Sequence, residues 1–298
     1  MESKIYPAEY SYFEIKRIIK ELSIKYPFLN TTSIGKSAAG RDIISLSIGS
    51  EKEHVVFISG DDPSMPVTTL ILLRFCEEIC HCILKGKELC GLNIRRAFFG
   101  RKITFIPLLN PDGAEIRLKG TFTDGYFSFN NRRPGNEDFK NWKSNLRGVE
   151  IARNFPFNFE ERKSAEKLNG IRTPGPFGFS GYTPASEAET IAFINFCTQN
   201  KINHLIHLSA FGETVSYSGI PDVPERSSQM AEIISAVSHY SICPPLGAAD
   251  NYICNWFANE YLKPAFCIKI GENNIPKVFD FYNQYNKIKE TLTLSSLF

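Results

Sequence analysis

The chain has 298 residues, of which 43% are hydrophobic, and its 34 basic and 32 acidic residues leave a net charge of +2. With so small a net charge, the protein has no overall electrostatic field that would attract nucleic acid. No apolar run reaches the roughly 18 residues that span a bilayer. We therefore expect neither a nucleic-acid nor a membrane partner. The first residues lack the apolar core of a signal peptide, which predicts a cytoplasmic location. No linker or repeat interrupts the sequence, so residues 1–298 are expected to form a single domain.

The apolar pattern predicts helices that alternate with strands. Apolar residues recur at helical spacing from Phe13 to Leu22, and Pro27 closes that helix. A longer helix is expected over residues 67–84, and another after Ser186, since Ser186 and Glu189 have the spacing of a capping box. Short apolar runs predict buried strands over residues 55–58, 103–109, 205–208 and 266–270. This order predicts an α/β fold with a mixed central sheet flanked by helices on both faces.

Residues 121–182 are rich in Asn, Gly, Pro and Phe and show little periodicity. They are expected to form surface loops that shape a pocket, with residues 130–134 and 177–182 as candidate lining segments. Eight cysteines in a chain without an export signal are expected to stay reduced. Four of them lie close together with one histidine, at Cys76, Cys80, His81, Cys82 and Cys90. Because they lack a paired C-x-x-C spacing, free thiols are favoured over a metal site.

Five sequence runs are informative together, because they occur in a fixed order. They are GKSAAGRDI (35–43), LLNPDG (108–113), DFKNWKSNLRGVEIARNFP (138–156), SEAET (186–190) and LIHLSAF (205–211). In this order they resemble the zinc metallocarboxypeptidases of the carboxypeptidase A type. The closer resemblance is to the bacterial branch that cleaves γ-D-glutamyl-diamino-acid peptides of the cell wall. It covers nearly the whole chain and implies a single carboxypeptidase-like domain.

The resemblance implies a zinc ion held by a His-x-x-Glu pair after the first central strand and by a later histidine. Here the strand HVVFISG is followed by Asp61, Asp62, Pro63 and Ser64, so Asp61 and Ser64 stand at the first two ligand positions. The third position matches His207. A catalytic zinc usually has three protein ligands, and serine is a poor one. We therefore expect no zinc and no other cofactor in this chain.

Lys269 stands where the family has its catalytic glutamate, in the run FCIKIG. Strand alternation places Lys269 on the face shared with Cys267. A cation there opposes a metal ion and, while protonated, cannot serve as a general base. We expect Lys269 to point into the former active-site cavity and to pair with Asp61, with Asp62 or with the acid group of a ligand. The alternative is a lysine that extends to solvent at the strand end.

Two arginines resemble those that hold the substrate in the family. Arg147 matches the one that polarises the scissile carbonyl, and Arg153 matches the one that binds the terminal carboxylate. The asparagine that precedes the second arginine in the family is Ala152 here. A guanidinium group suits a carboxylate because its planar fork binds both oxygens. A purely structural role for both arginines remains open.

Three functional hypotheses follow. The first is a catalytically inactive relative of a cell-wall-peptide carboxypeptidase, with a basic cleft for a peptide with a free carboxylate or for a partner protein. The candidate ligand-binding residues of that cleft are Asp61, Arg147, Arg153, His207 and Lys269. The second is an active metallopeptidase with an altered or weak metal site, or an enzyme with different chemistry built on Lys269, Cys267 and His207. The third is a structural or assembly protein.

Overall fold

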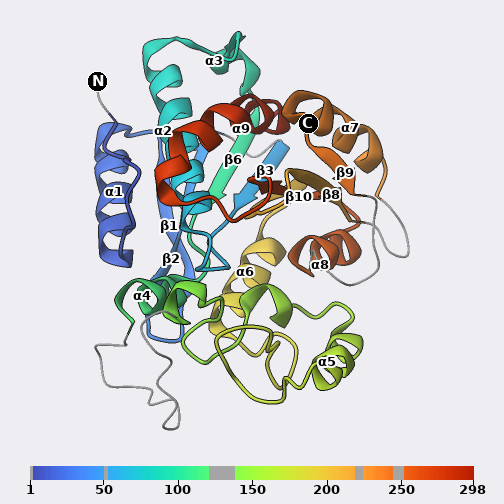
Figure 1. The fold of residues 1–298 in the computed structure, drawn as a ribbon. Coiled ribbons are helices and arrows are strands. Elements are labelled where there is room, and N and C mark those ends of the chain that lie inside the picture. The colour runs from blue at the N-terminus through green and yellow to red at the C-terminus, as the bar shows by residue number, and fades with distance from the viewer. Residues whose placement is uncertain (1–2, 50–52, 121–137, 219–223, 244–251) are drawn as a thin grey trace.

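The computed structural model describes residues 3–49, 53–120, 138–218, 224–243 and 252–298. Within these ranges, eight strands form one mixed sheet in the order β1-β2-β6-β3-β7-β10-β8-β9 (Figure 1). Their bounds are β1 Asn30–Lys36, β2 Asp42–Gly49, β3 Glu53–Ile58, β6 Arg101–Ile106, β7 His204–Ala210, β8 Thr214–Tyr217, β9 Ser241–Cys243 and β10 Ala265–Ile270. A separate short hairpin joins β4 Glu88–Leu89 to β5 Leu92–Asn93. The centre of the sheet, β6-β3-β7-β10, is parallel, so the carboxyl ends of these strands meet at one edge.

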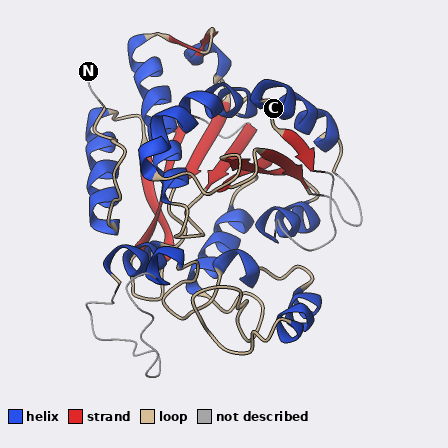
Figure 2. Ribbon diagram, viewed as in Figure 1, coloured by secondary structure: helices blue, strands red, loops and turns tan. Residues whose placement is uncertain are grey.

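Helices cover both faces of the sheet (Figure 2), as the sequence predicts. The α-helices are α1 Tyr12–Lys25, α2 Pro66–Lys85, α3 Ile94–Ala97, α4 Pro111–Lys119, α5 Phe159–Leu168, α6 Ala188–Gln199, α7 Ser227–Ser238, α8 Tyr252–Tyr261 and α9 Phe281–Ser295. Short 3-10 helices are η1 Asp138–Asn141, η2 Ile151–Asn154 and η3 Val278–Asp280. Among the described helices, none is long and apolar enough to cross a membrane.

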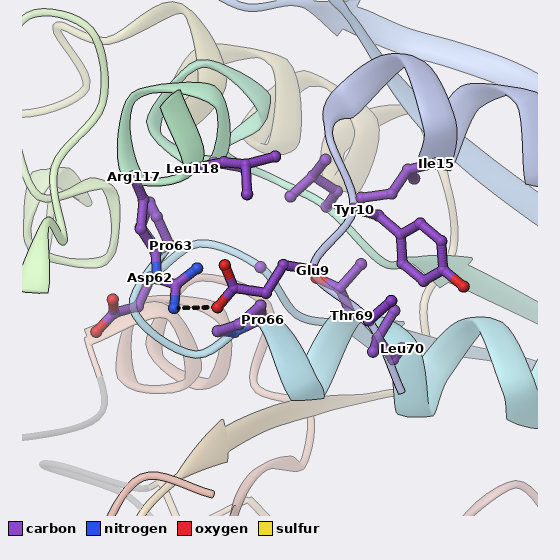
Figure 3. Close-up of a pocket in the computed structure, with 14 residues that line it drawn as sticks. Glu9, Tyr10, Ile15, Asp62, Pro63, Pro66, Thr69, Leu70, Arg117 and Leu118 are labelled. Carbon is purple, nitrogen blue, oxygen red and sulfur yellow. Dashed lines mark hydrogen bonds and ion pairs between the residues drawn. The ribbon is translucent and has the colours of Figure 1, made fainter. Parts of the chain in front are cut away.

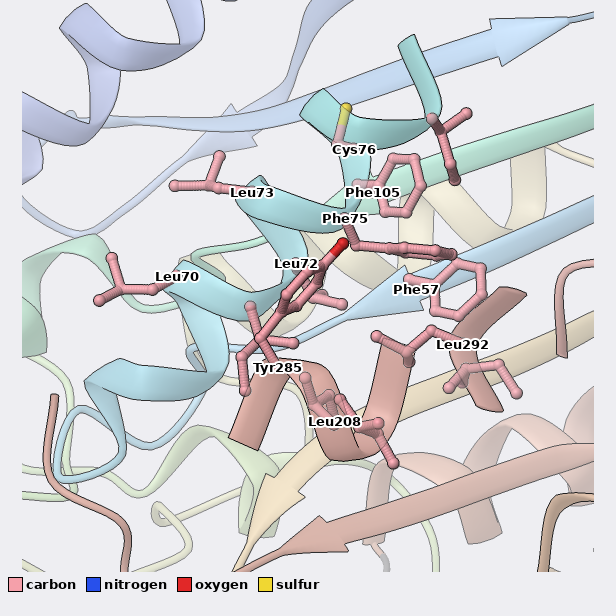
Figure 4. Close-up of a cluster of buried hydrophobic side chains, with 14 of the residues drawn as sticks. Phe57, Leu70, Leu72, Leu73, Phe75, Cys76, Phe105, Leu208, Tyr285 and Leu292 are labelled. Atoms are coloured by element: carbon pink, nitrogen blue, oxygen red, sulfur yellow. The ribbon is translucent and has the colours of Figure 1, made fainter. Parts of the chain in front are cut away.

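One hydrophobic core lies between the sheet and the helices α1, α2, α7 and α9. At its centre the ring of Phe57 from β3 stacks on Phe105 from β6, with 5.4 Å between centroids, and Phe75 of α2 meets both edge-on (Figure 4). Tyr285 and Leu292 of α9 belong to the same core (Figure 4). Such aromatic clusters bury large apolar areas, so this face anchors the strands whose ends carry the site.

The second core lies under α6, α8 and η2 on the opposite face. Phe155 packs against Trp256 of α8, with 5.0 Å between centroids, and against Phe193 of α6 at 6.0 Å. The residues of β7 and β10 alternate between the two cores, and Leu205 and Cys267 face this second one. Strand alternation then puts His207 and Lys269 on the same side as α8.

Some sequence predictions of local structure are wrong in detail. The strand expected to reach residue 109 ends at Ile106, because the chain then turns and Ile106 O accepts a hydrogen bond from Ser59 N. The capping box at Ser186 does not form: α6 begins after Glu187 with no side-chain cap, and Glu189 instead accepts a hydrogen bond from Ala38 N. Helix α5 was not expected, since its charged sequence has little apolar periodicity. The predicted lining segment 130–134 lies outside the described residues.

Candidate functional site

The loop after β3 is held in place by the motif LLNPDG. Asn110 of that motif donates its backbone N–H to Gly60 O and its side-chain Nδ2 to Asp61 O, at 2.9 and 3.1 Å. Gly60 adopts φ +67°, and a Cβ there would lie 2.7 Å from Pro107 O. Only glycine therefore fits at this position. The close approach of the Gly60 backbone to Pro107 fixes the position of the neighbouring Asp61.

Asp61, just after β3, and His207, in the middle of β7 and level with the last residue of β3, form a buried ion pair. His207 Nε2 donates to Asp61 Oδ1 at 2.8 Å, and the two residues are 6% and 7% exposed. Burial by itself would lower the pKa of His207 and raise that of Asp61, but each charge outweighs this effect on the other. The pKa of His207 thus lies well above its usual value and that of Asp61 lies below its own. Both groups are charged near neutral pH.

Two cysteine thiols pack against the same histidine. Cys254 of α8 lies close enough to His207 to affect its pKa, and Cys267 is the register partner of His207 across β7 and β10. Burial raises the pKa of the Cys254 thiol to about 11, although His207 opposes the shift. The Cys254 thiol therefore stays protonated near neutral pH and is not activated as a nucleophile.

Lys269 does not pair with Asp61. In the parallel register Lys269 lies beside Ser209, whereas Cys267 lies beside His207, so Lys269 is one side-chain step further toward the strand end. No carboxylate among the described residues forms an ion pair with the half-buried Lys269, and the predicted pairing with Asp61 or Asp62 is wrong. His207 takes Asp61, and Lys143 lies 3.6 Å from Asp62. Lys269 thus leaves its charge available to an external partner.

Ser64 lies just before α2 and points into protein. Its backbone N–H donates to Asp62 Oδ1 at 2.8 Å, while its hydroxyl is buried and has no partner among the described residues. The neighbouring Met65 accepts a hydrogen bond from Ser209 Oγ, with 3.6 Å between sulfur and oxygen. Met65 and Ser209 therefore fill the space between the loop and the strand that carries Lys269.

Asp62→Asn is expected to stabilise the protein more near pH 8 than near pH 5. Burial raises the pKa of Asp62 from 3.8 to about 7, although Lys143 and Ser64 oppose this shift. Between these two values the folded state holds a proton that the unfolded state has lost, so stability falls as the pH rises. Asparagine does not titrate, so the variant keeps its stability as the pH rises. Its free energy of unfolding, relative to that of the unmodified protein, should increase by on the order of 1–3 kcal/mol between about pH 5 and pH 8. Urea unfolding of both proteins measures it, and a pH-independent difference would contradict the assignment.

The predicted arginines lie in the loop region rather than at the ion pair. Arg153 Nε is 3.7 Å from the buried Glu166, and its guanidinium lies over the Tyr252 ring at 5.1 Å. The half-exposed Arg147 lies 3.8 Å from Glu187. None of the described contacts joins either arginine to the Asp61–His207 pair, and their substrate roles stay predictions.

A polar junction fastens the loops to the body of the protein. Asn145 Nδ2 donates to Glu187 and Glu189, at 2.8 and 3.2 Å, and Asn154 accepts from Glu187 N at 3.0 Å. Burial raises the pKa of Glu189 to about 7, and nearby Asp112 adds to the shift. The motifs SNLRGVE, EIARN and SEAET meet here, and hydrogen bonds between their polar side chains stabilise the loops.

A small cavity of about 30 Å³ lies on the far side of the loop, between the N-terminal segment, α2 and α4 (Figure 3). Arg117 donates to Glu9 at 2.9 Å across it, and Asp62 lies at its wall. The volume admits a water molecule but no amino-acid side chain of a ligand. We therefore place the candidate site at the strand ends instead.

Sequence reasoning missed Lys143, Cys254 and the Met65–Ser209 contact. Strand register carries the only signal for Ser209, because it follows from aligning β10 beside β7. Lys143 and Cys254 come from a loop and a helix far away in the sequence, so their approach depends on the folded chain.

The family model described as zinc carboxypeptidase matches residues 15–242. The chain belongs to the zinc carboxypeptidase family. It is similar to the uncharacterized protein YqgT of Bacillus subtilis (strain 168), with 28% identity over 297 residues that cover 96% of this chain and 75% of YqgT.

A second relative of this carboxypeptidase-family chain has a named activity. It is gamma-D-glutamyl-L-diamino acid endopeptidase 1 of Lysinibacillus sphaericus, with 25% identity over 275 residues, or 90% of this chain and 67% of that protein. The fold also matches carboxypeptidase A from Helicoverpa armigera, with a TM-score of 0.71 and 15% identity over 97% of this chain and 73% of that one. The resemblance inferred from the motifs is confirmed.

The residues at the family's zinc position do not fit the ion. Asp61 and His207 bond each other at 2.8 Å, and the Ser64 hydroxyl is buried. In the part of the chain that the structure describes, no three His, Cys, Asp or Glu side chains are grouped so that they could hold a metal ion. A tight zinc centre needs at least three such donors, so we derive no chemical step through zinc. The expected lack of a cofactor remains a prediction.

Proposed function

We propose that this carboxypeptidase-family protein is catalytically inactive and binds, without cleaving it, a peptide that carries a free carboxylate. The observation that carries the proposal is the Asp61–His207 ion pair, in which two groups at the former ligand positions satisfy each other. Because His207 Nε2 donates to Asp61 Oδ1, this nitrogen offers no lone pair to a metal in this arrangement.

The lysine at the position of the general base supports the same conclusion. Lys269 replaces the carboxylate that would activate water, and its charge repels a metal cation. Because no described carboxylate pairs with it, this half-buried ammonium group suits the acid group of a ligand. The half-exposed Arg147 offers a second cation on the loop side.

The ligand class follows from the relatives. The endopeptidase of Lysinibacillus sphaericus is named for γ-D-glutamyl-L-diamino acid peptides, so we propose a peptide of this class as the ligand. An isolated dipeptide of this kind carries carboxylates that Lys269 can bind. A partner protein would have to present the same chemistry, an acidic group at an exposed chain end.

Metal analysis and a peptidase assay test the proposal together. We expect purified protein to contain well under one zinc per chain and to leave a γ-D-glutamyl-diaminopimelate peptide intact in the presence of added zinc. Lys269→Glu alone should also be inactive, because a restored base has no metal-bound water to activate. Stoichiometric zinc that is lost in His207→Ala, or hydrolysis by the unmodified protein, would show that the chain is an active metallopeptidase.

A further inference from the structure

The outer face of helix α1 carries a row of side chains that the core does not use. The helix lies at one edge of the molecule (Figure 1), and the residues that it buries are Tyr12, Ile15, Ile18, Ile19 and Leu22. On the opposite side, four exposed residues recur at spacings of four, three and four: Phe13, Arg17, Lys20 and Ile24. At 3.6 residues per turn, these four lie within about 60° of one another around the helix axis. We call them the α1 stripe.

The two cations of the α1 stripe are not used by the described parts of the protein. The other charged side chains of this helix all have partners: Glu14 accepts from Ser11, Lys16 pairs with Asp42, Glu21 with Lys4 and Lys25 with Glu77. Neither Arg17 nor Lys20 forms an ion pair or a side-chain hydrogen bond with a described residue. Arg17 exerts only a Coulomb attraction on Glu14, which Ser11 already holds. Both charges are therefore available to an external partner.

The two ends of the α1 stripe are apolar. Phe13 is 62% exposed and Ile24 is 71% exposed, and three turns of helix, or about 16 Å, separate them. Single exposed apolar residues are common on protein surfaces, but spacings of four and three residues are those of a seam between two packed helices. The α1 stripe therefore has the form of a short helix-packing seam with apolar ends and a cationic middle.

We propose that the α1 stripe docks an acidic amphipathic helix of a partner protein. Apolar residues of that helix meet Phe13 and Ile24, and its carboxylates meet Arg17 and Lys20. The charge pattern disfavours a second copy of this chain, because two such stripes in register would set cations against cations in either direction. It also disfavours a lipid surface, since only two apolar side chains, separated by cations, would enter the bilayer. A seam of three turns buries little area, so the complex is weak and transient.

Fluorescence anisotropy of the full chain with two labelled helical peptides tests this inference. The acidic peptide carries Leu, Glu, Glu and Leu at the spacings of the α1 stripe, and the neutral peptide has Gln in place of both Glu residues. This seam reads the same in both directions, so parallel and antiparallel docking are both tested. The unmodified protein should bind the acidic peptide roughly fivefold more tightly, as expected for two exposed ion pairs. The double variant Arg17→Gln with Lys20→Gln should reduce this preference to within about twofold by weakening the acidic peptide alone.

The matched control removes two exposed cations elsewhere. Lys167 and Lys201 are exposed and form no ion pair with a described residue, so Lys167→Gln with Lys201→Gln should keep the preference for the acidic peptide. Ile24→Gln should weaken both peptides to a similar degree, because it removes an apolar contact that they share. Equal affinity of the unmodified protein for the two peptides, or binding of neither at about 1 mM, would overturn the inference.

Two further measurements distinguish the possible occupants. Self-association of the unmodified protein in sedimentation that Ile24→Gln abolishes would assign the α1 stripe to a second copy and contradict the proposal. Binding to phosphatidylglycerol vesicles that the Arg17 and Lys20 double variant loses would contradict it as well. The inference does not rest on the proposed function, which the zinc and peptidase measurements test separately.

Discussion

Replacing His207 with alanine is expected to lower the free energy of unfolding by about 3 kcal/mol, because it leaves the Asp61 carboxylate buried without its partner. His207 lies level with the last residue of β3, and the pair is less than one tenth exposed. Water cannot fully replace the lost bond there, and the pKa of Asp61 should rise in response. Urea unfolding near neutral pH measures the change.

The control for this experiment keeps the hydrogen bond and removes both charges. The double variant Asp61→Asn with His207→Gln should lose much less stability than His207→Ala, because neither side chain is then a buried, unpaired ion. A double-mutant cycle over the two positions gives the coupling energy directly. If His207→Ala unfolds at the same urea concentration as the unmodified protein, the ion pair does not stabilise the fold.

Asn154→Ala is expected to cost about 3 kcal/mol, since the two N–H donors and the oxygen of this fully buried amide form the equivalent of three hydrogen bonds, at roughly 1 kcal/mol each. The two hydrogens of Nδ2 are shared among Ser180 O, Thr183 O and Ser186 Oγ, at 2.8, 3.2 and 3.0 Å, and Oδ1 accepts from Glu187 N at 3.0 Å. These bonds connect the end of η2 to the loop that precedes α6. Without them the loop should open before the rest of the protein unfolds.

Asn169→Ala is the matched control, because Asn169 is exposed and its side chain bonds only Ala165 O in the described structure. It should change stability by less than about 0.5 kcal/mol. Limited proteolysis adds a second readout: Asn154→Ala should be cut within residues 170–186 at protease levels that leave the control intact. Equal protection of the two variants would show that Asn154 does not hold this loop.

The fold follows from the sequence because its central strands and helices are long, apolar and regularly spaced. The strands that became β3, β7 and β10 are buried on both sides, and such runs have few alternatives. The mistakes lie at ends and in loops. Helix α5 has little apolar periodicity, and the end of β6 depends on its contact with the loop after β3.

The neighbourhood of Asp61 and His207 was predictable from the sequence, but their direct pairing was not. The sequence places Asp61, His207 and Lys269 at or near the ends of three strands; His207 lies beside Ile58, the last residue of β3, and Lys269 lies beside Ser209, two residues further along β7. Which of them meet depends on register: a step of two residues along β10 separates the neighbour of His207 from the neighbour of Ser209. Single-sequence reasoning has no measure of that step, so it could not exclude Asp61 and Asp62 as partners of Lys269; the acid group of a ligand stays a prediction.

The two thiols that pack against His207 give this part of the molecule its own probes of motion. Cys254 and Cys267 are at most 2% exposed, so a thiol reagent reaches them only when the end of the sheet opens. Their rates of alkylation therefore count opening events between α8 and β10, without any added label. Because the buried Asp61–His207 ion pair belongs to the same cluster, the opening frequency reports how strongly that pair holds this end of the sheet closed.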